Sequence, residues 1–127
     1  QPLDAPVGLR PRPAGASAPR PDAVAAGDLL RGKALYQSFC AICHGARGEG
    51  DGRAIPLGVP KPRSYHDPAV RDQPEGYFYF AATNGFGRML PYKSRIPERE
   101  RWLIAHYIKR CLLSEACPEE VVHAEVH

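Results

Sequence analysis

The sequence contains no long apolar segment: its uncharged apolar runs extend over only a few residues, whereas about 20 are needed to cross a bilayer. We therefore expect no transmembrane segment. With 127 residues, the chain is also too short for an enzyme with separate cofactor and substrate domains. Because 24% of the residues are charged and 43% are hydrophobic, both ordinary values, neither a fully disordered chain nor a coiled coil is expected.

The N-terminus carries neither an initiator methionine nor a charged segment followed by an apolar one, and the first residue is Gln1. We interpret the chain as a mature protein from which a signal peptide has been removed. The first residue is also not cysteine, which argues against the lipid anchor of bacterial lipoproteins.

Proline and glycine, in contrast, are abundant, with 14 and 12 residues, and they favour a loop-rich body with short helices over a large sheet. Residues 1–27 hold six of the prolines and seven alanines, which is typical of an extended arm. Ordering such an arm costs about 1–2 kcal/mol per residue, so we expect it to pack on the body through Leu3, Val7 and Leu9. The rest of the chain is divided into a domain at 28–111 and an acidic extension at 112–127.

Charge is unevenly distributed around the formal net value of +3. Residues 31–63 hold six Lys or Arg against two acids, and residues 88–110 hold seven against two, whereas residues 111–127 have four Glu and no Lys or Arg. No nucleic-acid recognition motif accompanies the basic stretches. We therefore expect these stretches to attract an acidic protein partner.

Hydrophobic spacing and capping residues predict an all-α fold made of short helices. The main helices are predicted over about 29–40, 74–84 and 97–110, with shorter ones at 68–72 and after Pro118. Asp28 is the expected N-cap of the first helix, and Pro97 is the expected first residue of the last main helix. Gly32 lies in mid-helix, where it costs up to about 1 kcal/mol relative to Ala, so we expect another backbone to pass close to it.

The chemistry of the chain is indicated by residues 40–44, Cys-Ala-Ile-Cys-His, because C-x-x-C-H is the attachment signature of c-type haem. Cys40 and Cys43 can each form a thioether with one porphyrin, and the adjacent imidazole of His44 can then bind the iron. Two alternatives are less favoured. A thioredoxin-like pair would need a strand before it and a helix after it, and a four-thiolate zinc site with Cys111 and Cys117 would have an unusually long second spacing.

Met89, the single methionine, is the candidate for the second axial ligand of the iron. A lone methionine is more often part of a core, but this one lies in a predicted loop with glycines before it and a proline after it. It also follows His44 by 45 residues, enough chain to pass around a porphyrin. The remaining histidines lie in less suitable segments; they are His66, His106, His123 and His127.

A wider pattern surrounds these ligands: Gly32, Tyr36, Cys40, Cys43, His44 and Gly45, the loop around Met89, and Ala105-His106-Tyr107-Ile108. With this pattern, residues 29–111 resemble a class I c-type cytochrome. The resemblance implies a three-helix core around one covalently bound haem, with Gly32 and Tyr36 meeting Ile104 and Tyr107 where the first and last helices cross. It also implies that the carbonyl of Pro56, or that of Pro60, accepts a hydrogen bond from His44.

A narrower likeness is carried by three segments: Asn84-Gly85-Phe86-Gly87-Arg88-Met89, Ile96-Pro97 with Arg101-Trp102, and Ser64-Tyr65-His66-Asp67. They are similar to the mono-haem cytochrome subunit of alternative complex III, a quinol-oxidising membrane assembly of bacterial respiration. The likeness covers about residues 58–108 and departs from that subunit where Leu90 stands between Met89 and Pro91. It implies a one-electron carrier, not an enzyme, that passes electrons from such a complex to a haem-copper terminal oxidase. A haem peroxidase or a gas sensor with a detachable Met89 is the alternative.

The expected iron ligands are therefore His44 and Met89. The full set of expected haem-binding residues is Cys40, Cys43, His44, Met89, Pro56, Tyr65, Leu90 and Tyr92. Further expected walls of the haem pocket are Leu57, Val59, Phe78 and Ile96. The charges expected to surround the exposed haem edge and to steer acidic partners are Lys33, Arg47, Lys61, Arg88, Lys93 and Arg95.

Haem c is attached outside the cytoplasm in bacteria, so we expect a periplasmic protein, or one otherwise outside the cytoplasmic membrane, that is monomeric when free. In that oxidising space, Cys111 and Cys117 are expected to form a disulfide that pins the acidic extension to the body. The alternative is a buried Cys111 and a free Cys117.

Overall fold

The computed structural model describes residues 24–126, which form helices and loops without a β-strand. The helices are α1 (Ala26–Phe39), α2 (Ala41–His44), α3 (Pro68–Arg71), α4 (Glu75–Asn84), α5 (Glu98–Tyr107) and α6 (Glu119–Val122), with a 3₁₀ turn at Ile55–Leu57 and a π-helical turn at Ile108–Leu112. This part of the chain has the predicted all-α architecture, and none of its helices is long and apolar enough to span a membrane. The predicted contacts of Leu3, Val7 and Leu9 lie outside the described residues.

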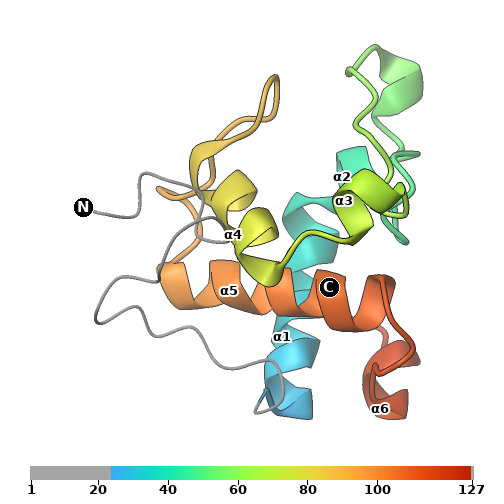
Figure 1. Cartoon of the computed structure of the whole chain (residues 1–127), viewed down its shortest axis with the longest axis vertical. Helices are drawn as coiled ribbons and strands as arrows, with labels where there is room; N and C mark the ends of the chain where they lie inside the picture. Colours follow the sequence, from blue (N-terminus) through green and yellow to red (C-terminus); the bar gives the residue numbers. More distant parts are fainter. Residues whose placement is uncertain (1–23, 127) are drawn as a thin grey trace.

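A close approach of two backbones fixes the crossing of α1 and α5 at the centre of the molecule (Figure 1). A Cβ atom on Gly32 would lie 2.4 Å from the carbonyl oxygen of Leu103, so a larger residue does not fit there. Beside this contact, the rings of Tyr36 and Tyr107 lie 5.7 Å apart. The close passage predicted at Gly32 is confirmed, although the neighbouring backbone is that of Leu103 rather than that of Ile104.

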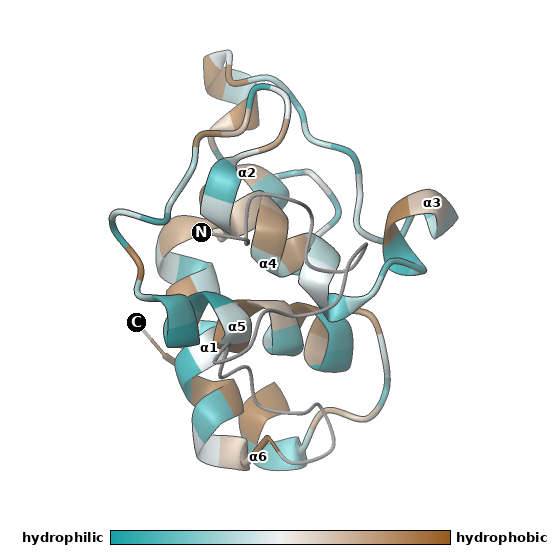
Figure 2. Ribbon diagram, turned by 60° about the vertical axis from the view of Figure 1, so that its left-hand side comes forward, coloured by the Kyte–Doolittle hydropathy of each residue, from teal (hydrophilic) through white to brown (hydrophobic). Residues whose placement is uncertain are grey.

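Helix α4 packs on α5 through a stacked aromatic pair. The rings of Tyr79 and Trp102 lie 4.1 Å apart with 10° between their planes, and both side chains are almost completely buried. Figure 2 shows hydrophobic residues on α4, in the middle of the molecule. The helix ends at the predicted place, because Gly85 adopts a φ of 79° that most other residues avoid. From there the chain enters the loop that carries Met89.

Two helix starts differ from the prediction. Helix α1 begins at Ala26, so Asp28 lies in its first turn and is not its N-cap. The Asp28 carboxylate accepts a hydrogen bond from Arg99 at 3.2 Å, and an acid in a first turn is also favoured by the helix dipole. Pro97 is the N-cap of α5 rather than its first residue.

The C-terminal extension is tied to the body at two points. The first is the predicted disulfide between Cys111 and Cys117, whose Cα atoms lie 4.5 Å apart. The second is the Nζ of Lys33, which donates hydrogen bonds to three carbonyl oxygens at the end of α6; these belong to Val121 (2.7 Å), Val122 (3.1 Å) and Ala124 (2.8 Å).

Lys33 was predicted to be one of the exposed charges around the haem edge. That prediction is wrong, because the side chain of Lys33 is buried. The physical reason lies at the end of α6. The last carbonyl groups of a helix have no partner within the helix, and a buried ammonium group from α1 supplies the missing donors. The positive charge also complements the C-terminal end of the helix dipole.

Candidate functional site

The C-x-x-C-H segment folds as one helical turn directly after α1. The N–H of Cys40 bonds to the carbonyl oxygen of Tyr36 at 2.8 Å and ends α1, and α2 then positions Cys43 and His44. The N–H of His44 bonds to the carbonyl oxygen of Cys40 at 2.9 Å, which closes the turn. Both thiols are free, with Cys40 buried and Cys43 half-buried. The turn therefore brings two thiols and one imidazole together.

The glycine-rich segment after His44 folds back on this turn. The N–H of Gly50 donates to the carbonyl oxygen of His44 at 2.8 Å. The hydroxyl of buried Tyr36 donates to the carbonyl oxygen of Gly45 at 2.6 Å. These bonds fix the backbone of the motif and leave its side chains available for a ligand.

The imidazole of His44 lies against the ring of Tyr65, with 4.8 Å between the ring centroids and 19° between the planes. Burial lowers the pKa of His44 to about 4, because the charged imidazolium loses its hydration. The ring is therefore neutral at pH 7. The neutral imidazole is also the form that binds a metal ion.

The Nδ1 atom of His44 is buried and has no hydrogen-bond partner among the described residues. The predicted bond to the carbonyl of Pro56, or to that of Pro60, is thus not made. Pro56 lies in an exposed 3₁₀ turn that closes on itself, with the N–H of Leu57 bonded to the carbonyl oxygen of Ala54 at 3.0 Å. A buried ring nitrogen without a partner is uncommon and is consistent with a functional role for His44.

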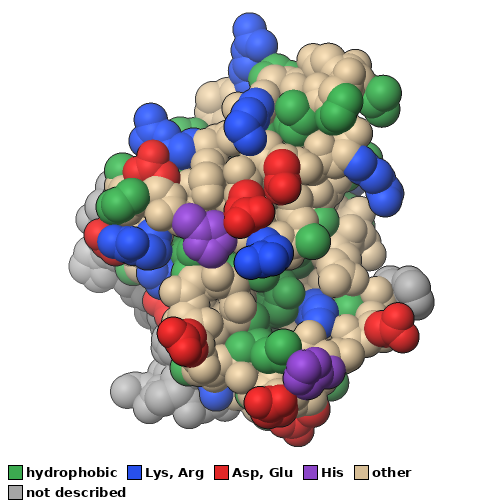
Figure 3. All heavy atoms as spheres, turned by 90° about the vertical axis from the view of Figure 1, so that its right-hand side faces the viewer, with side chains coloured by type: hydrophobic (Ala, Val, Ile, Leu, Met, Phe, Trp, Pro, Cys, Tyr) green, Lys and Arg blue, Asp and Glu red, His purple; other side chains and the backbone are tan. Residues whose placement is uncertain are grey.

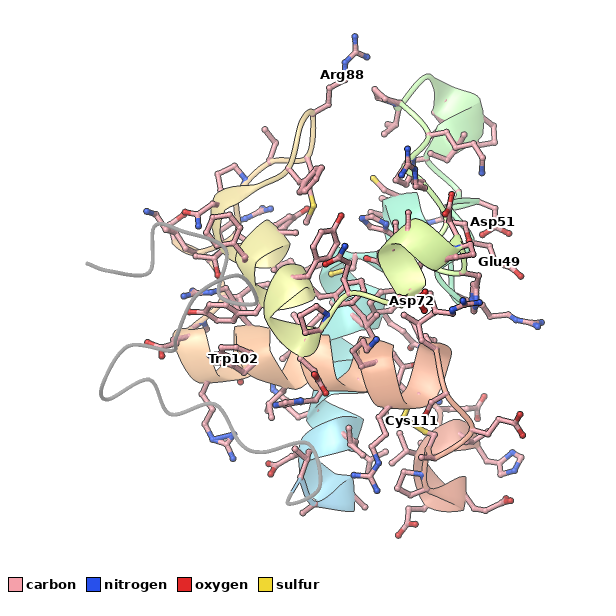
Figure 4. The ribbon with its side chains drawn as sticks, in the orientation of Figure 1. Glu49, Asp51, Asp72, Arg88, Trp102 and Cys111 are labelled. Carbon is pink, nitrogen blue, oxygen red and sulfur yellow. A yellow bond between two sulfur atoms is a disulfide. The ribbon has the colours of Figure 1, made fainter. Side chains whose placement is uncertain are left out.

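Met89 lies in a narrow loop that leaves α4 at Gly85. The loop turns back through two backbone hydrogen bonds between Phe86 and Met89, with N···O distances of 3.2 and 2.8 Å. A Cβ atom on Gly85 would lie 2.4 Å from the carbonyl oxygen of Met89, so the turn requires glycine. Met89 is half-buried, and its neighbour Arg88 points away from the body at the tip of the loop (Figure 4).

The end of this loop packs on the end of α1, beside the C-x-x-C-H turn. The ring centroids of Tyr92 and Phe39 lie 6.0 Å apart, and the Tyr92 hydroxyl donates to the carbonyl oxygen of Phe39 at 3.4 Å. The guanidinium of Arg95 lies 4.6 Å from the centre of the Tyr92 ring. Because Phe39 directly precedes Cys40, this contact joins the Met89 loop to the motif that carries the thiols.

The predicted pocket walls fall into two groups. Tyr65, Phe78 and Ile96 are buried, and Phe78 meets Tyr65 edge to face with 5.4 Å between the centroids. The others are exposed; they are Leu57 at 84%, Leu90 at 70% and Val59 at 37%. These exposed side chains belong to the 3₁₀ turn segment and the Met89 loop, which both extend from the same end of the molecule (Figure 1). Covering their surface with an apolar group would stabilise the site by about 25 cal/mol per Å².

The donor set fits a haem c better than the two alternatives. The disulfide removes Cys111 and Cys117 from a four-thiolate zinc site, and no group of three or more potential metal ligands occurs between residues 24 and 126. A helix precedes the C-x-x-C pair, whereas a thioredoxin-like pair follows a strand. What remains is two free thiols and a neutral imidazole on one turn, with a thioether in a loop packed beside it.

Residues 27–108 match the model of a protein family described as cytochrome c oxidase, cbb3-type, subunit III. The chain belongs to this family of c-type cytochromes. The protein therefore carries covalently bound haem c and belongs to a family of electron-carrying cytochromes. No curated protein sequence matches this cytochrome significantly.

Several solved structures resemble the cytochrome, including the following three. One comes from the Kuenenia stuttgartiensis reducing HAO-like protein complex Kustc0457/Kustc0458, with 27% identity and a TM-score of 0.59 over 78% of this chain and 50% of that chain. The KustC0563 c-type cytochrome shares 21% identity and a TM-score of 0.51, over 61% of this chain and 93% of that one. Cytochrome cL from Hyphomicrobium denitrificans has 18% identity and a TM-score of 0.50, over 80% of this chain and 61% of that chain. The last two matches show the fold alone, and this chain spans only half of the first relative.

One residue beside the site was not predicted to take part in it. Arg101 on α5 is only 7% exposed and donates hydrogen bonds to the end of the Met89 loop. The available signal was a charged residue next to Trp102 in the apolar stripe of a predicted helix. Such a residue is either a solvated edge of the stripe or a buried charge with partners, and the sequence does not distinguish the two.

Proposed function

We propose that this cytochrome is a mono-haem, one-electron carrier in which Cys40 and Cys43 hold the haem and His44 and Met89 are the axial ligands of its iron. The observation that best supports the proposal is the contact between the end of the Met89 loop and the end of α1. It supports the proposal because the thioether of Met89 belongs to a loop whose end is packed beside the turn that carries the thiols and the imidazole.

Each residue has a distinct task in this proposal. The thiols of Cys40 and Cys43 each add to a vinyl group of the porphyrin, with sulfur on one vinyl carbon and hydrogen on the other, so that no oxidant or reductant is consumed. When bound, haem c supplies an iron that gains and loses one electron. His44 contributes a neutral imidazole that Tyr65 shields on one side, and the thioether of Met89 favours the ferrous state and raises the reduction potential.

The redox partners in this proposal present acidic surfaces. The predicted charges Arg88, Lys93 and Arg95 are exposed on the Met89 loop, and Lys61 is exposed on the segment after the 3₁₀ turn. Figure 3 shows hydrophobic side chains flanked by Lys and Arg at the upper end of one face, the end from which both loops extend. A basic rim around an apolar centre favours fast, salt-sensitive association.

The finer proposal is that electrons arrive from a quinol-oxidising complex of the alternative complex III kind and leave to a haem-copper terminal oxidase. The family description names an oxidase subunit, and one similar structure belongs to a protein complex. Both support the proposal that this cytochrome exchanges electrons with larger protein assemblies. We place the protein outside the cytoplasmic membrane, where haem c is attached and where the Cys111–Cys117 disulfide is stable. Reduction by the donor complex is expected to slow as ionic strength rises, and a salt-independent rate would contradict charge-steered docking.

The ligand assignment is tested by spectroscopy of the holoprotein. The ferric wild type is expected to show the weak far-red band of methionine-bound haem, and the ferrous form is expected to bind carbon monoxide slowly at pH 7. Met89→Leu should lose the band and bind carbon monoxide rapidly. Ser94→Ala, a change at an exposed position after Met89 in the same segment that is not among the expected haem contacts, is the matched control and should keep both properties. Rapid carbon monoxide binding by the wild type would instead favour a peroxidase or a gas sensor.

A further inference from the structure

Arg101 is a buried charged residue whose hydrogen-bond partners between residues 24 and 126 are all neutral. Its side chain extends from α5 and is 7% exposed. Nε donates to the hydroxyl of Thr83 at 2.9 Å, and one terminal nitrogen lies 3.3 Å from the hydroxyl of Tyr79. The other terminal nitrogen donates to the carbonyl oxygens of Ile96 at 2.5 Å and Lys93 at 3.2 Å.

These acceptors lie on both sides of one loop. Thr83 stands near the end of α4, two residues before the loop begins at Gly85, whereas Lys93 and Ile96 lie at its other end, four and seven residues after Met89. A single guanidinium therefore joins the two ends of the Met89 loop. A backbone bond from the N–H of Tyr92 to the carbonyl oxygen of Ala82 at 2.8 Å closes the same junction.

Stability alone is a weak explanation for this arrangement. A buried charge loses its hydration, and an apolar side chain of similar volume is often as stabilising or more so at such a position. What an apolar residue does not provide is the directional fork that binds several oxygens at once. Bound backbone carbonyls fix the path of a loop, since each of the two bonds constrains the position and the orientation of a peptide group.

We infer that Arg101 is a positioning residue that clamps the two ends of the loop and thereby holds the thioether of Met89 on the haem iron. The inference rests on the proposed function, because it takes Met89 as the ligand. It assigns to Arg101 a role in keeping Met89 on the iron that is exerted through the Met89 loop. Loss of the clamp would let the loop open more often, with the covalent haem and His44 still in place.

The test compares three holoprotein variants with the wild type. Arg101→Gln removes the charge and most of the fork, and Arg101→Lys keeps the charge but not the planar fork. Arg99→Gln is the matched control, because Arg99 lies on the same helix, is exposed and pairs only with Asp28 among the described residues. The measurements are the far-red band of the ferric protein, the reduction potential, and the rate at which imidazole binds the ferric haem.

Imidazole can bind only when Met89 has left the iron, so its binding rate reports loop opening. Both Arg101 variants are expected to bind imidazole at least about tenfold faster and to show a weaker far-red band, and Arg99→Gln should match the wild type. The inference is overturned if Arg101→Gln changes the reduction potential but leaves the far-red band and the imidazole rate unchanged. Arg101 would then act only through its charge. An Arg101→Lys variant that behaves like the wild type would overturn it as well.

Thr83→Val keeps the test decisive if the Arg101 variants do not fold. This nearly isosteric change removes one acceptor from the clamp and leaves the guanidinium in place, so a smaller rise of the imidazole rate is expected, and no rise would contradict the inference. The proposed function fails separately: a wild-type protein without the far-red band, or a Met89→Leu variant that keeps it, would show that Met89 is not the ligand. The role of Arg101 is refuted when the wild type shows the far-red band and the Arg101 variants change neither this band nor the rate of imidazole binding.

Discussion

The ring of Tyr65 lies flat against the imidazole of His44, 4.8 Å away and within 19° of parallel. Tyr65 is 8% exposed and also contacts Phe78 edge to face. This one aromatic side chain therefore connects the C-x-x-C-H turn to α4. The contact holds the imidazole in one orientation and excludes water from one of its faces, which is also why burial depresses the pKa of His44.

Replacing Tyr65 by Leu is expected to lower the free energy of unfolding of the holoprotein by about 2–3 kcal/mol, because a buried ring is lost and a cavity is left beside His44. Tyr65→Phe retains the stacked ring and should change stability by less than about 1 kcal/mol. Denaturant unfolding followed by haem absorbance measures both variants. Equal losses in the two would show that the hydroxyl, not the ring, carries the contribution.

The low pKa of His44 predicts that stability depends on pH. Between pH 6.5 and about 4 the unfolded chain binds a proton on this residue and the folded protein does not. The contribution is fully present above pH 6.5, and the free energy of unfolding should fall by about 1.4 kcal/mol for each unit below it. Under the proposed ligation, an iron bond to His44 would act in the same direction, since a proton would compete with the metal.

Denaturant titrations of the holoprotein at pH 7.5, 6.5, 5.5 and 4.5 measure this slope. A free energy of unfolding that stays constant from pH 6.5 to 4.5 would contradict a buried, neutral His44.

The helix crossing gives a prediction with a built-in comparison. Gly32→Ala should destabilise the protein by about 1–3 kcal/mol or more, since the added Cβ atom meets the Leu103 backbone at 2.4 Å and a backbone does not yield easily. Gly27→Ala, in the same helix with nothing within 4 Å of the added atom, should stabilise it by up to about 1 kcal/mol. Thermal unfolding distinguishes the two, and a neutral Gly32→Ala would show that α1 and α5 are less closely packed.

Lys33 provides a prediction for the C-terminal extension. Lys33→Met removes hydrogen bonds to three carbonyl groups in α6 and directly after it and is expected to cost about 1–3 kcal/mol, because the buried carbonyl of Val121 and the partly buried carbonyls of Val122 and Ala124 lose a charged donor. Amide hydrogen exchange in α6 should accelerate, whereas exchange in α5 should change little. Arg31→Met is the control: Arg31 lies on the same helix, is more than half exposed and pairs with Glu100, so a cost below about 1 kcal/mol is expected. Unchanged amide hydrogen exchange in α6 after Lys33→Met would show that Lys33 does not hold α6 on the body.

The identity of the site follows from local sequence to a large extent. Cys40, Cys43 and His44 are close in space because they are close in the chain, and one helical turn is enough to bring them together. Gly85 ends α4 where its sequence predicts, since a single residue in a left-handed conformation terminates a helix without help from distant segments. Covalent proximity and backbone preference are properties of short segments, and short segments are what a sequence specifies directly.

The environments of the charged residues were decided only by the tertiary structure. Lys33 was expected on the surface, but its partners lie 88 to 91 residues away, in the C-terminal segment that follows the Cys111–Cys117 disulfide. Arg101 likewise obtains its role from Thr83, Lys93 and Ile96, which meet only after α4 and α5 have packed. Whether a charge is solvated or buried depends on which distant oxygens surround it, and that is a property of the packed fold.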